Sequence, residues 1–74
     1  MDLLQIISFS KKNGYDDVIY LGPWNGYDAY EPIFNDSDTH YIGVPLIILV
    51  NGNTIRMSTV EEALEHLDEL LALN

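Results

Sequence analysis

The chain has 74 residues, of which 47% are hydrophobic, and its 12 acidic and 3 basic residues give a net charge of −9. This size and apolar content predict a single globular domain over residues 1–74 and argue against a disordered tail. The lack of cysteine excludes a disulfide framework and a cysteine metal cluster. Nucleic acids and anionic membranes require a basic protein surface. Only Lys11, Lys12 and Arg56 are basic, so we expect neither partner.

Nothing along the chain indicates export or membrane insertion. The longest strongly apolar run, 44–50, contains Pro45 and is far shorter than the roughly 20 residues that cross a bilayer. The N-terminal segment lacks the basic region and the small-residue cleavage site of a signal peptide. We therefore expect a soluble, cytoplasmic protein.

The first element is predicted to be a helix that Asp2 caps and that ends near Asn13. Gly14 follows as a helix-ending residue, and two lysines lie where they favour the negative end of the helix dipole. Residues 6–9 are also compatible with a strand, which leaves that alternative open. The apolar residues of this segment are Leu3, Leu4, Ile6, Ile7 and Phe9.

A hairpin is predicted next. Residues 18–21 are mostly β-branched or aromatic and indicate a strand, whereas 22–26 are rich in turn-forming residues. The segment 27–34 is then the returning strand. Pro32 cannot donate a ladder hydrogen bond, so we expect this second strand at a sheet edge. The polar segment 35–43 is expected to be a loop.

A second hairpin follows. Residues 46–50 form a continuous apolar run, which is typical of a central strand covered on both faces. Asn51-Gly52 is the strongest hairpin signal in the chain. The alternation in 54–57 predicts that Ile55 and Met57 point inward and that the other two residues point outward.

The last segment has the clearest helical pattern. Ser58 or Thr59 can cap it, with Glu61 or Glu62 completing a capping box. His66 falls on its polar side, one turn beyond Glu62. The apolar residues recur on one helical face, which we expect to pack on the sheet; they are Val60, Ala63, Leu64, Leu67, Leu70 and Leu71.

Together these elements predict an α+β fold in the order α-β-β-β-β-α, with a small four-stranded, mostly antiparallel sheet, an N-terminal helix and a C-terminal helix. Placing the strand that contains Pro32 at the edge gives the spatial strand order two-one-three-four. If both helices cover the same face of the sheet, the other face needs cover from a second subunit. A homodimer is therefore one hypothesis.

The segment around Asp36, Asp38 and His40 is the weak candidate for a metal site. Carboxylates at alternate positions resemble the start of a calcium-binding loop, but the required Gly and Glu are replaced by Tyr41 and Ile47. A solvated loop with a local Asx-turn is the favoured interpretation, and we expect no bound metal. No phosphate-binding loop or activated nucleophile is visible either, so we expect no cofactor and no enzymatic activity.

Two surfaces are candidates for binding another protein. Trp24 sits beside a turn, where an exposed aromatic residue with a polar handle would suit an interface, and Tyr27 lies close by. The last helix carries Glu61, Glu65 and Glu69 at mutually repulsive i,i+4 spacing. Its acidic face is too short for a convincing mimic of DNA. The face is either solubilising or retained for a basic partner.

The leading functional prediction is a non-enzymatic protein-interaction or regulatory module that uses Trp24, Tyr27, Glu61, Glu65 and Glu69. The alternative is a small-molecule or metal-binding protein that uses the first hairpin and the 35–43 loop. The polar residues available to this alternative are Tyr30, Glu31, Asp36, Asp38 and His40.

Overall fold

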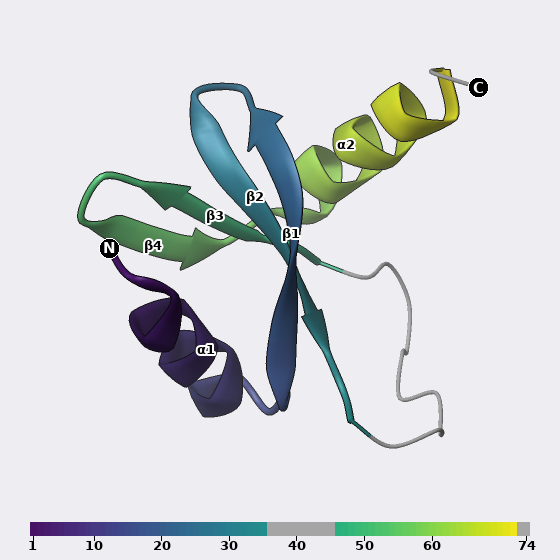
Figure 1. Ribbon diagram of the computed structural model, residues 1–74. Coiled ribbons are helices and arrows are strands. Elements are labelled where there is room, and N and C mark those ends of the chain that lie inside the picture. Colours follow the sequence, from purple (N-terminus) through teal and green to yellow (C-terminus); the bar gives the residue numbers. More distant parts are fainter. Residues whose placement is uncertain (36–45, 73–74) are drawn as a thin grey trace.

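The computed structural model describes residues 1–35 and 46–72, which form two helices and one four-stranded sheet (Figure 1). The predicted α+β class and the element order α-β-β-β-β-α are confirmed. The elements are α1 (Leu3–Lys12), β1 (Asp17–Trp24), β2 (Tyr27–Ile33), β3 (Ile48–Asn51), β4 (Thr54–Met57) and α2 (Val60–Ala72).

The strands are joined as an antiparallel meander in the order β1-β2-β3-β4. The predicted order two-one-three-four is therefore wrong, because β2 lies inside the sheet although it contains Pro32. Pro32 is paired with Val18 of β1, whereas the pairing of β2 with β3 extends only over 28–30. Its missing N–H thus removes no hydrogen bond toward β3, and an inner strand tolerates the proline.

The first hairpin turns more tightly than its sequence suggested. Trp24 pairs with Tyr27, so the turn consists of Asn25-Gly26 alone, with φ of 49° and 81° as a type I′ turn requires. Gly22 and its neighbour Pro23 lie within β1, where a turn had been predicted. The register shifts between Tyr20 and Gly22, and Gly22 has φ of 109°, so the glycine serves a β-bulge.

The second hairpin is confirmed, with its turn one residue later than the Asn51-Gly52 signal. Asn51 pairs with Thr54, and Gly52, at φ 59°, opens the two-residue turn. The ladder continues beyond the strands, because the Ser58 N–H donates to the Ile47 carbonyl at 2.7 Å. The Ile47 N–H in turn donates to Ser58 Oγ at 3.0 Å.

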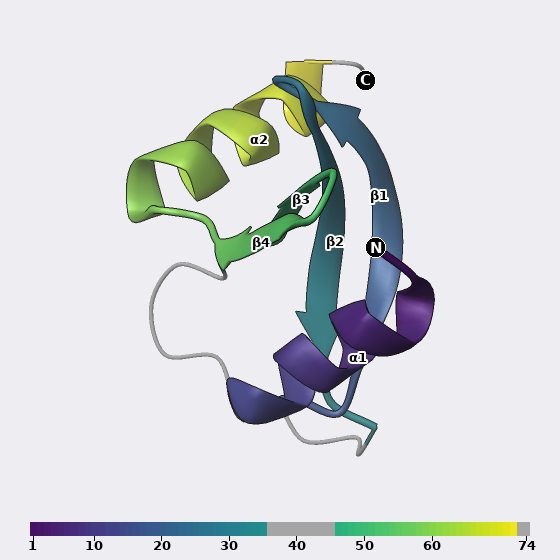
Figure 2. The same ribbon diagram turned by 90° about the vertical axis from the view of Figure 1, so that its left-hand side faces the viewer.

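The two helices cover opposite faces of the sheet, as the two views in Figures 1 and 2 illustrate. Ile48 and Val50 pack with Ile6 of α1 on one face, whereas Leu49 packs with Trp24 on the other. All three β3 residues are buried, which confirms the predicted central strand with both faces covered. The condition for the homodimer hypothesis, two helices on one face, is not met.

Helix α1 begins and ends as predicted. The Asp2 carboxylate accepts from the Gln5 N–H, the Gln5 side chain accepts from the Asp2 N–H, and Gly14 follows the helix with φ of 93°. Its buried side is narrow. Ile6 and Ser10 are buried, whereas Leu3 and Leu4 are 56% and 76% exposed.

Candidate protein-interaction surface

Helix α2 begins at a capping box formed by Thr59 and Glu62. The Glu62 N–H donates to Thr59 Oγ1 at 3.1 Å, and the Thr59 N–H donates to the Glu62 carboxylate at 2.8 Å. Thr59 and Glu62 were two of the residues predicted for this box. The cap fixes where α2 leaves β4 and therefore which side of the helix faces the sheet.

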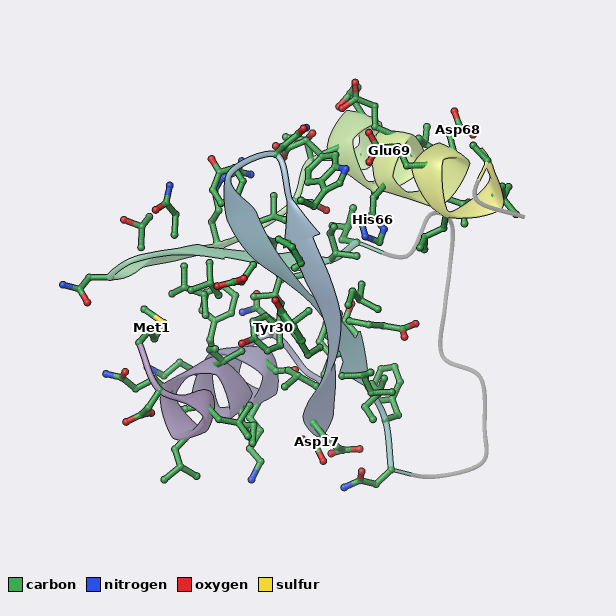
Figure 3. The ribbon with its side chains drawn as sticks, turned by 45° about the horizontal axis from the view of Figure 1, so that its top comes forward. Met1, Asp17, Tyr30, His66, Asp68 and Glu69 are labelled. Atoms are coloured by element: carbon green, nitrogen blue, oxygen red, sulfur yellow. The ribbon has the colours of Figure 1, made fainter. Side chains whose placement is uncertain are left out.

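The side of α2 that faces the sheet is formed by Ala63 and His66, which are 5% and 7% exposed. The imidazole of His66 packs edge-on against the indole of Trp24, with ring centroids 5.7 Å apart. Trp24 Nε1–H donates to the Glu69 carboxylate one turn further along. Figure 3 places His66 on the side of α2 that faces the strands and Asp68 on the side away from them.

Arg56 of β4 forms the second attachment of α2. Its guanidinium donates two hydrogen bonds of 2.8 Å to the Glu62 carboxylate, and its Nη2 donates to the Tyr27 hydroxyl at 3.2 Å. The same guanidinium lies 5.0 Å from the centre of the Tyr27 ring. The hydrogen bonds from Arg56, with that from the Thr59 N–H, lower the pKa of Glu62 from 4.5 to about 2. The bond to Glu62 likewise raises the pKa of Arg56.

These contacts correct three predictions. Trp24 is 7% exposed and is a core residue, because the two-residue turn leaves it inside β1 with its ring under α2. His66 is buried against that ring and does not lie on a solvated polar side. Arg56 does point away from Ile55 and Met57, which pack on the α1 face, but it meets α2 and not open solvent.

The larger correction concerns the apolar side of α2. The predicted core face is mostly outside, because only Ala63 of its six members is buried. We call Val60, Leu64, Leu67 and Leu71 the leucine stripe; they are 47%, 44%, 46% and 63% exposed. Their spacing of four, three and four residues places them along one line of the helix surface.

An acidic row runs beside the leucine stripe and consists of Glu61, Glu65 and Asp68, all of them exposed. At 100° per residue these three carboxylates cluster on one flank of the stripe, away from the sheet. Helix α2 contains no lysine or arginine over residues 60–72. Glu69, predicted to belong with Glu61 and Glu65, is instead engaged by Trp24 at the sheet.

The described residues give little support to the alternative small-molecule or metal site, because their candidate polar side chains are not brought together. Tyr30 and Glu31 are neighbours in β2, so their side chains leave opposite faces, and Tyr30 packs on Tyr20 with ring centroids 5.1 Å apart. A hydrogen bond to Asp28 raises the pKa of Tyr20. The weak metal candidates Asp36, Asp38 and His40 lie outside the described residues. Across 1–35 and 46–72, no group of three or more histidine or acidic side chains is arranged to hold a metal ion.

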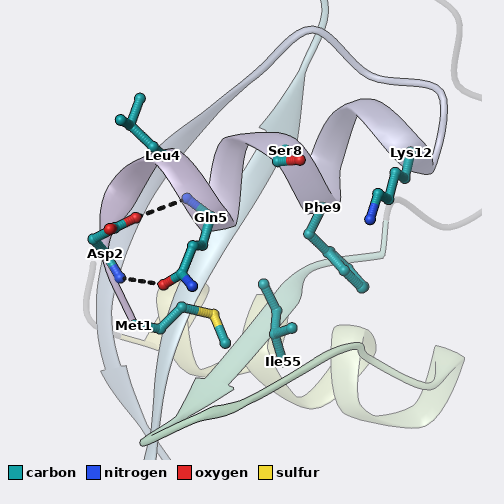
Figure 4. Close-up of a pocket in the computed structure, with 8 residues that line it drawn as sticks. All are labelled: Met1, Asp2, Leu4, Gln5, Ser8, Phe9, Lys12 and Ile55. Carbon is teal, nitrogen blue, oxygen red and sulfur yellow. Dashed lines mark hydrogen bonds between the residues drawn. The ribbon is translucent and has the colours of Figure 1, made fainter.

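A shallow groove between α1 and β4 was not predicted from the sequence. It has a volume of about 410 Å³, and Leu4, Phe9 and Ile55 supply much of its apolar lining (Figure 4). Two of its polar groups, Asp2 and Gln5, are already hydrogen-bonded to each other in the α1 capping box. The signal that sequence reasoning missed is the exposed Leu4, which lies beyond the narrow buried side of α1.

Comparison with protein-family models, with curated proteins and with solved structures finds no match to this chain. Neither of the two helices in the described part of the chain has the length and apolar character needed to cross a membrane. Function must therefore be inferred from the geometry of α2 and its surroundings.

Proposed function

We propose that this chain is a non-enzymatic protein-interaction or regulatory module and that its binding surface is the outer side of α2. The observation that carries the proposal is the leucine stripe, in which four aliphatic side chains are each at least 44% exposed. Burial of apolar surface stabilises by about 25 cal/mol per Å², so leaving these side chains in water forgoes stability. Contiguous exposed apolar residues with a polar border are typical of interaction sites.

The attachment of α2 supports the same proposal. Ala63, His66, Glu62 and Glu69 hold one side of the helix to the sheet. A helix that is already folded and anchored before binding presents its outer side at a smaller ordering cost than a segment that folds on binding. The acidic, cysteine-free composition fits a role in the cytoplasm.

Affinity capture with three versions of the chain tests the proposal. The wild type is compared with a stripe variant, Leu64→Ser with Leu67→Ser, and with a control variant, Leu3→Ser with Ile19→Ser. The control removes the same number of exposed aliphatic side chains, and both lie outside α2 and outside the groove between α1 and β4. We expect a protein that is retained by the wild type and the control and lost with the stripe variant, while circular dichroism remains unchanged in all three. Capture that is identical for all three proteins would contradict the proposal.

The groove between α1 and β4 favours a second candidate function, the binding of a small molecule. Its volume of about 410 Å³ falls within the range of ligand pockets, roughly 300–1,000 Å³. A ligand that binds the native state must raise its stability. A thermal-shift screen of metabolites and metal ions, repeated with Ile55→Trp to fill the groove, tests this function. A ligand whose shift survives the substitution binds elsewhere.

A further inference from the structure

We infer that the partner of α2 is an amphipathic helix that carries lysine or arginine along one flank of its apolar stripe. This inference rests on the proposed function and names the chemistry of the partner. It combines three observations: the spacing of the leucine stripe, the acidic row beside it, and the absence of basic side chains along α2.

The spacing of the leucine stripe selects a helix as the occupant. Positions 60, 64, 67 and 71 alternate steps of four and three residues, which is the a/d pattern that accepts the side chains of a second helix. The stripe runs about 17 Å along α2 at 1.5 Å per residue, so three turns of a partner helix would cover it. An extended peptide binds by adding main-chain hydrogen bonds to a sheet edge, and the surface of a helix offers none.

The acidic row selects a basic partner. Glu61 and Glu65 repel each other at i,i+4, and Asp68 adds a third negative charge on the same flank. Arg56, the cation nearest along the chain, already donates two hydrogen bonds to Glu62, which lies between the acidic row and the side of α2 that faces the sheet. A basic flank on the partner would lower this repulsion, speed association and fix the direction in which the two helices lie.

A second copy of this chain fits the surface less well. Another α2 would bring a second acidic row and no lysine or arginine, whichever way it ran. The stripe also covers fewer than two heptads, whereas self-sufficient coiled coils sustain about three to four. Helix α1 of a second copy does carry Lys11 and Lys12, but its most exposed leucines are the neighbours Leu3 and Leu4 and do not form a stripe.

A charge-swap experiment with designed peptides tests the inference. Both peptides are amphipathic helices of about 20 residues, long enough to be helical in water, with leucine at a and d. One has lysine along the flanking positions and the other has glutamate there. The wild-type chain is compared with the triple variant Glu61→Lys, Glu65→Lys, Asp68→Lys. Binding is measured by titration calorimetry at low and high salt.

The wild type is expected to bind the lysine peptide at least about tenfold more tightly than the glutamate peptide, and the triple variant to reverse this order. The preference should shrink in ~1 M salt, where the Debye length is about 3 Å. Leu64→Ser with Leu67→Ser should abolish binding of either peptide, and Leu3→Ser with Ile19→Ser should leave it unchanged.

Three results would overturn the inference, and they separate it from the proposed function. If neither peptide binds while a native protein is still captured through Leu64 and Leu67, the module stands and the basic-helix partner is wrong. Equal binding of both peptides by the wild type would show that the acidic row does not select a basic partner. A wild-type dimer in sedimentation equilibrium that the stripe variant disperses identifies a second copy as the occupant.

Discussion

Replacing Trp24 tests how α2 is fixed to the sheet. Trp24 is 7% exposed, packs in a cluster with Ala29 and Leu49, and donates from Nε1 to Glu69. Truncation of a buried aromatic residue to alanine costs about 3–5 kcal/mol. A domain of this size loses roughly 4–8 °C of Tm per kcal/mol, so Trp24→Ala should lower Tm by at least about 12 °C. Trp24→Phe keeps most of the packing and loses the hydrogen bond, at about 1 kcal/mol.

The assay is urea unfolding followed by circular dichroism, with Tm from calorimetry. Trp24 is the chain's one tryptophan, so native fluorescence reports its surroundings directly. We expect blue-shifted emission that moves to the red on unfolding. Glu69→Ala in the Trp24→Phe background should cost less than in the wild type, because the shared bond is already absent. Emission typical of an exposed indole, together with a cost below about 1 kcal/mol for Trp24→Ala, would refute the burial of this residue.

Two further predictions concern the polar contacts of β4 and α2. Glu62 has its pKa lowered from 4.5 to about 2, so its contribution to stability is complete above pH 4.5 and is lost as pH falls toward 2. The stability difference between wild type and Glu62→Gln should therefore narrow over that window in acid titrations, with Glu61→Gln as the exposed control. Ser58→Ala should cost about 1–3 kcal/mol in urea unfolding, because it leaves the Ile47 N–H unpaired in a buried position. Ser8→Ala, at an exposed position of α1, should change stability by less than about 0.5 kcal/mol.

Local chemistry explains why much of the fold could be predicted. Asp2 and Gly14 bound α1 through a side-chain cap and a positive φ, and both signals depend only on neighbouring residues. The apolar run at β3 predicted a strand covered on both faces, because a strand with one face in water has alternating apolar and polar residues. The predicted strand order was wrong because it considered only that Pro32 lacks a backbone N–H. Whether an N–H is needed at position 32 depends on how far β3 extends along β2, which is set by the tertiary structure.

The candidate site was harder to predict, because its residues change role with the exact length of a turn. Four turn-forming residues, at positions 22, 23, 25 and 26, surround Trp24 and indicated that it belonged to a loop. The chain needs only Asn25-Gly26 to reverse, so the indole stays in β1 and becomes core. Glu61, Glu65 and Glu69 were correctly assigned as exposed, but the hydrogen bond that Glu69 accepts from Trp24, 45 residues away in sequence, could not be foreseen.

The polar groups of the sheet determine which side of α2 packs against it. That face of the sheet presents two donors, the Arg56 guanidinium and Trp24 Nε1, as well as apolar groups. A leucine-lined helix side packed there would leave Trp24 Nε1 without its acceptor and the Arg56 guanidinium without its carboxylate partner, and an unpaired buried donor costs about 1–3 kcal/mol. Glu62 and Glu69 supply the acceptors, with Ala63 and His66 between them. Satisfying the sheet's donors therefore turns the leucine stripe outward, and the surface proposed for binding is a consequence of how α2 is anchored.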